Sequence, residues 1–82
     1  MSAFHYVYLL ESIDSPGTFY VGLTNNLPDR LRRHNAGLIT HTAKHGVWRI
    51  RTAIAFRDRT AAAAFERYLK TGSGRAFAKR HF

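Results

Sequence analysis

The stretch from residue 48 to residue 56 alternates between side chains suited to a protein core and side chains suited to solvent. The first set comprises Trp48, Ile50, Thr52, Ile54 and Phe56, and the second comprises Arg49, Arg51, Ala53 and Ala55. A period of two places each set on its own face of an extended chain. The stretch therefore predicts a β-strand with one buried face, so the fold must contain a sheet.

Two more strands are expected nearer the start of the chain. Residues 4–10 and 18–23 are rich in aromatic and β-branched side chains, which favour strands. The segment 14–17 between them contains Pro16, which fixes one φ angle, and Gly17, which tolerates a positive one. These features predict a turn, so the first two strands should form a hairpin.

A helix is expected over residues 27–35. Asn25 or Asn26 can cap its first turn, where Pro28 is tolerated and Asp29 complements the helix dipole. The segment 35–37 ends the helix with a glycine suited to the left-handed conformation. Residues 37–46, with a glycine at each end, then read as a polar loop.

A second helix is expected from Asp58 or Thr60, as its cap, through the alanine run to Lys70. The helical period predicts a core face made of Ala61, Phe65, Tyr68 and Leu69. The segment 72–74, with two glycines, should stop this helix, and residues 75–80 can form a short third one.

The expected order is therefore ββαβαα, in a single domain covering residues 1–82. We expect an α+β fold with a small three-stranded antiparallel sheet flanked by helices. A chain of 82 residues, 45% of them hydrophobic, can bury one modest core. It contains no cysteine, which excludes disulfides, thiolate nucleophiles and cysteine-based zinc sites.

The charge of the chain points to a polyanionic partner. It carries 13 Lys and Arg against 5 Asp and Glu, a formal net charge of +8. Such an excess attracts nucleic acid, although charge can also serve solubility alone. The apolar stretch 4–10 is too short to span a membrane, and no Lys or Arg precedes it as in a secretory signal. We expect a soluble cytoplasmic protein with no membrane partner.

Two side chains of the first helix are candidates for catalysis. Arg30 and His34 are four residues apart, so they meet on one flank of the stripe that Leu27 and Leu31 direct toward the sheet. This spacing brings a fixed positive charge beside a proton-transfer group. The alternative is a surface arginine beside a histidine that packs at the edge of the core.

Glu66 of the second helix is a candidate metal ligand. Its helix face is lined by small side chains, and Mg²⁺ often uses one or two carboxylates, with waters and substrate oxygens completing its octahedron. The alternative is a surface ion pair with Lys70, one turn later, which contributes only a few tenths of a kcal/mol.

Four short motifs, taken in order along nearly the whole chain, resemble those of the GIY-YIG nuclease superfamily. They are Tyr6-Val7-Tyr8, Tyr20-Val21-Gly22, the run 30–37 with Arg30, His34 and Asn35, and the run 66–70 followed by 72–75. The chain is most similar to the small stand-alone bacterial members and to the GIY-YIG nuclease domain of excinuclease. The first motif lacks the glycine of the family and keeps its tyrosine at Tyr8.

The resemblance implies a metal-dependent DNA endonuclease. One Mg²⁺ or Mn²⁺ ion would be held by Glu66, and Arg30 would stabilise charge on the scissile phosphate. Tyr8 would act as general base, Tyr20 would orient the site, and His34 would assist proton transfer. An ordinary tyrosine, with a pKa of about 10, is a poor base at neutral pH. We therefore expect Arg30 and the metal to favour its phenolate. Without the resemblance, these tyrosines would read only as sheet aromatics.

The expected partner is DNA, with RNA not excluded. The candidate nucleic-acid contacts are Arg32, Arg33, His41, Arg49, Arg51, Lys70 and Arg75. His41 and His45 are four residues apart, but no third metal ligand accompanies them, so they read as solvated loop residues. We expect little sequence preference and cleavage directed by DNA structure or by single strands, in DNA repair or processing. The alternative is a non-catalytic nucleic-acid-binding module that keeps the nuclease fold.

Overall fold

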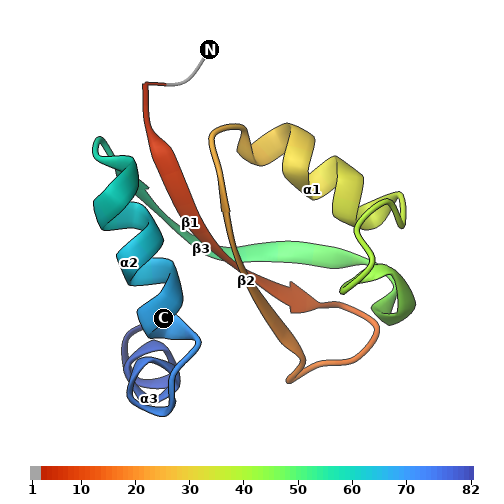
Figure 1. Cartoon of the computed structure of the whole chain (residues 1–82). Coiled ribbons are helices and arrows are strands. Elements are labelled where there is room, and N and C mark those ends of the chain that lie inside the picture. Colours follow the sequence, from red (N-terminus) through yellow and green to blue (C-terminus); the bar gives the residue numbers. More distant parts are fainter. Residues whose placement is uncertain (1–2) are drawn as a thin grey trace.

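A computed structural model describes residues 3–82 and contains one three-stranded antiparallel sheet with helices on both sides (Figure 1). The elements, in chain order, are β1 (His5–Ser12), β2 (Phe19–Thr24), α1 (Leu27–Asn35), the short 3₁₀ helix η1 (Ala43–His45), β3 (Trp48–Phe56), α2 (Arg59–Leu69) and α3 (Gly72–His81). The predicted α+β class and the ββαβαα order are confirmed.

The central strand is β1, because the strand order across the sheet is β2-β1-β3. Within this ladder Tyr8 lies opposite Gly22 of β2 and Ala53 of β3. The register between β1 and β3 shifts at Leu9 and Leu10. The strand β2 is therefore an edge strand, and the tyrosine of β1 faces a glycine on it.

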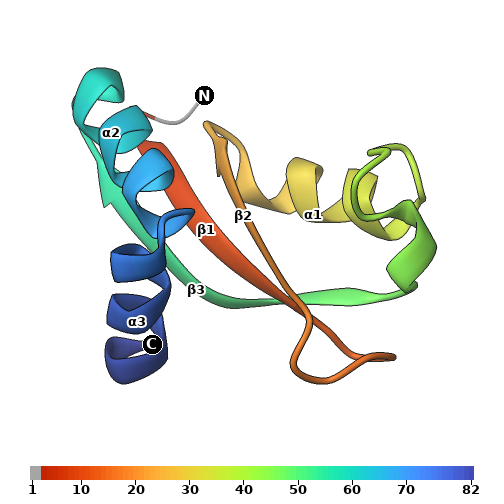
Figure 2. The ribbon, with the colours of Figure 1, turned by 60° about the horizontal axis from the view of Figure 1, so that its bottom comes forward.

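Each face of the sheet has its own apolar cluster. On one face Tyr8, Leu10 and Trp48 are buried together and pack against leucines of α1. On the other face Val7 packs with Ala62 and Leu69 of α2, and side chains of α3 extend that cluster. The two views of the ribbon show α1 on one side of the twisted sheet and α2 with α3 on the other (Figure 2).

Side-chain caps fix where the first two helices begin. Asn26 is the cap of α1, and its side-chain oxygen accepts a hydrogen bond of 3.1 Å from the backbone N–H of Asp29. Asp58 caps α2 in the same way, through the backbone N–H of Thr60 at 3.0 Å. After α1, Gly37 has a φ of 75°, the left-handed conformation expected at a helix end.

The core face of α2 differs from the expectation by one residue. Ala61 is exposed, whereas Ala62 is fully buried, and Tyr68 is 39% exposed. The buried stripe runs through Ala62, Phe65 and Leu69, at spacings of three and four residues, which is the period of a helix face. The run of alanines hid this register, because neighbouring identical side chains carry no pattern.

The segment 72–74 opens α3 instead of merely ending α2. Thr71 caps the new helix by accepting a hydrogen bond from the backbone N–H of Gly74 at 3.1 Å. A Cβ at Gly74 would overlap the backbone of Tyr68 and Leu69, so this glycine allows the two helices to meet closely. The third helix is accordingly longer than the expected 75–80.

The loop 37–46 is held by the first residue of β3. The indole N–H of Trp48 donates to the backbone oxygen of Thr42 at 3.0 Å. The side chain of Asn35 exchanges two hydrogen bonds with the backbone of Trp48, at 2.7 and 3.1 Å. These bonds fix the loop over the end of α1. No helix within residues 3–82 is long and apolar enough to cross a membrane.

Candidate active site

The position of Tyr8 depends on the glycine beside it. Tyr8 is 1% exposed, and its ring lies over Gly22 of the neighbouring edge strand. A Cβ at position 22 would overlap both the ring and the hydroxyl of Tyr8. Gly22 therefore lets the ring lie flat across the ladder, which directs its hydroxyl toward α1.

Tyr8 begins a buried chain of hydrogen bonds. Its hydroxyl lies 2.9 Å from Nε2 of His34, and Nδ1 of His34 lies 2.7 Å from Oγ1 of Thr42. The Thr42 hydroxyl donates its single hydrogen to the backbone oxygen of Ile39, so it accepts the N–H of His34. This order leaves Nε2 of His34 without a proton, and Nε2 accepts the hydrogen bond that Tyr8 donates.

Tyr20 of β2 packs beside this chain. Its ring centre lies 5.1 Å from that of His34 and 6.4 Å from that of Tyr8. Tyr8 and His34 themselves meet edge to face at 5.8 Å. Three of the five predicted catalytic side chains are thus in mutual contact.

Charges from α1 and α2 act on the same tyrosine. Burial raises the pKa of Tyr8 to about 12, and the nearby charges of Tyr20 and Glu66 also raise it. The Arg30 guanidinium lowers it through its charge and a side-chain hydrogen bond. Arg30 therefore acts in the expected direction, but burial outweighs it, so the phenol keeps its proton at neutral pH.

His34 is held in its neutral form. Burial lowers its pKa below the ordinary value, and the positive charge of Arg30 lowers it further. A neutral imidazole with its proton on Nδ1 can accept a second proton at Nε2, where it faces Tyr8. The cluster is therefore arranged to move a proton away from the tyrosine.

Glu66 approaches the cluster from the other side of the sheet. Its side chain is only 17% exposed and forms an ion pair with Lys70. Both sequence interpretations of Glu66 thus hold in part, because the carboxylate is paired with Lys70 and also acts electrostatically on Tyr8. It does not point into bulk solvent.

The donors around Glu66 fit one kind of metal ion. Within residues 3–82 there is no group of three or more His, Asp or Glu side chains that could hold a metal. A zinc site is therefore not supported. A single half-buried carboxylate suits Mg²⁺, which keeps several waters and binds phosphate oxygens. Glu66 is the residue that would hold such an ion.

The predicted nucleic-acid contacts do not form one surface. Arg32 and Arg33 lie exposed on α1 and pair with Asp29, at 2.7 and 3.7 Å. Arg49 and Arg51 of β3 both pair with Glu11 at 3.1 Å. His41 is exposed in the loop. Lys70 and Arg75 line a cavity beside Tyr20. His45 packs its ring edge to face with Trp48, at 5.9 Å, so it is not simply solvated.

Sequence reasoning missed Thr42 as a member of the site. A single threonine in a loop carries no periodic pattern, and its role depends on the loop folding back over α1. Its exposure is 0%, which is unusual for a polar loop residue, and only the three-dimensional arrangement shows this.

Comparisons with known proteins agree with this geometry. Residues 4–80 match the family model described as the GIY-YIG catalytic domain. A structure-specific endonuclease subunit SLX1 homolog of Leishmania infantum is 43% identical over 77% of this chain. The SLX1 homolog of Giardia intestinalis is 37% identical over 74% of it. The subunit SLX1 of Scheffersomyces stipitis is 50% identical over 44% of it. The chain spans only 10%, 18% and 11%, respectively, of the lengths of these relatives.

Proposed function

The chain belongs to the GIY-YIG nuclease family, and we propose that it is a metal-dependent endonuclease that hydrolyses phosphodiester bonds of DNA. The observation that carries this proposal is the hydrogen-bonded chain from Tyr8 through His34 to Thr42. Arg30 and Glu66 bring opposite charges to the same tyrosine. A module that only binds DNA has no need of a buried proton relay beside a carboxylate.

Tyr8 is the proposed base. As a water molecule attacks phosphorus, it passes a proton to the Tyr8 oxygen, and the phenolic proton moves to Nε2 of His34. The bond from phosphorus to the leaving ester oxygen breaks, and that oxygen then takes up a proton. His34 returns the proton to Tyr8 afterwards. Thr42 keeps His34 in the tautomer that can accept.

Arg30 is the proposed electrostatic partner of the phosphate. Its guanidinium lies near the Tyr8 hydroxyl, where the scissile phosphate must approach the base. A fixed positive charge there stabilises the negative charge that builds on the phosphoryl oxygens. A bound Mg²⁺, held by Glu66, would supply further positive charge to the phosphate and to the attacking water. Tyr20 orients the phosphate or the water by hydrogen bonding.

We propose that the substrate is DNA with a particular structure, such as a branch or a single-stranded segment. The relatives are named structure-specific endonuclease subunits, which supports this class of substrate. The exposed arginines of α1 and β3 are largely paired with acids of the protein, so no continuous positive surface suits reading a long duplex. Phosphate contacts without base contacts give little sequence preference.

Cleavage of end-labelled DNA tests the proposal. Single-stranded, duplex and branched DNA, with RNA for comparison, are incubated with Mg²⁺ or with EDTA. We expect metal-dependent cutting of branched or single-stranded DNA by the parent. Glu66→Gln, which keeps the shape of the side chain, should abolish cutting and retain binding.

A non-catalytic module would behave differently in the same assay. It would bind these substrates without metal-dependent cutting of any of them, and Glu66→Gln would bind like the parent. That pattern would overturn the nuclease proposal.

A further inference from the structure

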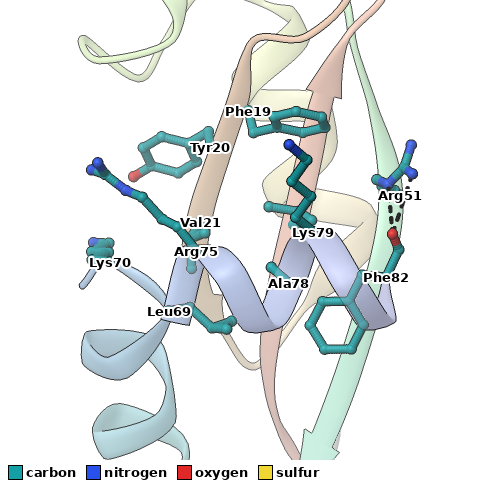
Figure 3. Close-up of a pocket in the computed structure, with 11 residues that line it drawn as sticks. Phe19, Tyr20, Val21, Arg51, Leu69, Lys70, Arg75, Ala78, Lys79 and Phe82 are labelled. Atoms are coloured by element: carbon teal, nitrogen blue, oxygen red, sulfur yellow. Dashed lines mark hydrogen bonds between the residues drawn. The ribbon is translucent and has the colours of Figure 1, made fainter. Parts of the chain in front are cut away.

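A cavity of about 850 Å³ lies beside the catalytic cluster, between β2 and α3 (Figure 3). Its floor is apolar and includes Leu9, Val21 and Ala78. Its volume falls within the usual range of small-ligand pockets, about 300–1,000 Å³. The cavity is therefore large enough for one or two nucleotides and too small for a duplex.

The wall of the cavity on the β2 side presents an exposed aromatic ring. Phe19 is 48% exposed although it is a large apolar residue in a strand. The guanidinium of Arg51 lies 5.8 Å from its ring centre. Exposed aromatic rings in a basic groove are the usual stacking platforms for unpaired bases, because every base has an aromatic face.

The opposite wall carries two positive charges from α3. Arg75 and Lys79 are four residues apart and project from the same helix face into the cavity, Arg75 toward Tyr20 and Lys79 toward Phe19 (Figure 3). Within the described part of the chain, no acidic side chain forms an ion pair with either of them, in contrast to Arg49 and Arg51. These two cations are available for an anionic ligand.

Two residues join the cavity to the catalytic cluster. Tyr20 lines the cavity, and its ring also contacts His34 and Tyr8. Lys70 lines the cavity and forms an ion pair with Glu66. A strand that places one phosphate at the cluster can therefore continue directly into the cavity.

We propose that this cavity binds an unpaired nucleotide of the DNA strand, next to the phosphate that is cut. The base stacks on Phe19, and the backbone phosphates lie against Arg75 and Lys79. The assignment to a strand beside the scissile bond rests on the proposed nuclease function. Binding of single-stranded DNA in the cavity does not depend on cleavage, so the two proposals can fail separately.

Fluorescence anisotropy of a labelled oligothymidylate in EDTA, measured at several salt concentrations, tests the inference. We expect Phe19→Leu to weaken binding about fivefold or more, because stacking contributes at least about 1 kcal/mol per base. Phe19→Trp, which keeps an aromatic face, should bind like the parent. Lys79→Gln should lower the slope of log K against log salt by about one.

Lys44→Gln is the matched control, since it removes one exposed charge from η1, on the α1 side of the fold. It should change binding less than Lys79→Gln does. Circular dichroism confirms that each variant is folded. Equal binding by the parent, Phe19→Leu and Lys79→Gln overturns the inference, and so does an equal effect of Lys44→Gln and Lys79→Gln.

Cleavage by the same proteins is read separately. If the parent binds the oligonucleotide through Phe19 and Lys79 but cuts no DNA with Mg²⁺, the cavity assignment stands and the nuclease proposal fails. If the parent cuts DNA while the cavity variants bind normally, the nuclease proposal stands and the cavity assignment fails.

Discussion

The hydroxyl of Thr42 should control the proton position on His34, and Thr42→Val tests this. The substitution keeps the branched shape and removes only the acceptor of the 2.7 Å bond from Nδ1. The Trp48 indole is unaffected, because it bonds to the backbone oxygen of Thr42. The change therefore isolates one hydrogen bond in a fully buried position.

The cost follows from the buried donor that the change leaves behind. An unsatisfied buried N–H costs about 1–3 kcal/mol. In a domain of this size each kcal/mol lowers the melting temperature by about 4–8 °C. If the proton moves to Nε2 to avoid this cost, His34 can no longer accept from Tyr8. Thr42→Val should therefore lose stability, the proton relay, or both.

Three measurements read these effects: urea unfolding, the ¹⁵N chemical shifts of the His34 ring, and the rate of DNA cleavage. Thr42→Ser is the control, because it keeps the hydroxyl and loses one methyl group, worth about 0.8 kcal/mol. It should keep the Nδ1–H tautomer and most of the cleavage. A Thr42→Val protein with the stability, tautomer and rate of the parent would refute the proposed relay.

Three further predictions concern the same cluster. Gly22→Ala should cost about 1–3 kcal/mol by overpacking against Tyr8 and should slow cleavage, whereas Gly72→Ala, with nothing within 4 Å of the added Cβ, should do neither; equal urea midpoints for the two variants would contradict the packing. Because burial lowers the pKa of His34, its contribution to stability is present above the unfolded value of about pH 6.5 and is lost as the pH falls through the folded value. Urea midpoints should therefore fall more steeply below about pH 6.5 in the parent than in His34→Gln, and parallel curves would exclude this role. Lys70→Ala should tighten the binding of Mn²⁺ in isothermal titration, since it removes the ion-pair partner of Glu66, and an unchanged affinity would count against Glu66 as the ligand.

Local patterns were enough to predict the fold. The alternation over 48–56, the turn at Pro16 and Gly17, and the cap at Asp58 each depend on neighbours in the sequence, and each matches the structure. The core face of α2 was misread by one residue because four consecutive alanines give no contrast. The glycines before Arg75 looked like a stop, but their use in the contact between α2 and α3 is a tertiary feature.

The candidate site was predictable only where motifs named it. Tyr8, Arg30 and His34 do come together, and spacing along one helix accounted for the last two. Thr42 could not be found, because its part in the site arises from a loop held by Trp48. The direction of the Tyr8 pKa also required the structure, since the effect of burial outweighs that of Arg30.

The central claim is that Tyr8 and Glu66 act together on one phosphate. Single-turnover cleavage by Tyr8→Phe, Glu66→Gln and the double variant tests it most directly. We expect each single change to slow cleavage by about 10²-fold or more, and the double variant to be no slower than the slower single one, because residues that act as a unit are not additive. Cutting at the parent rate by either single variant, or effects that simply multiply, would contradict the claim.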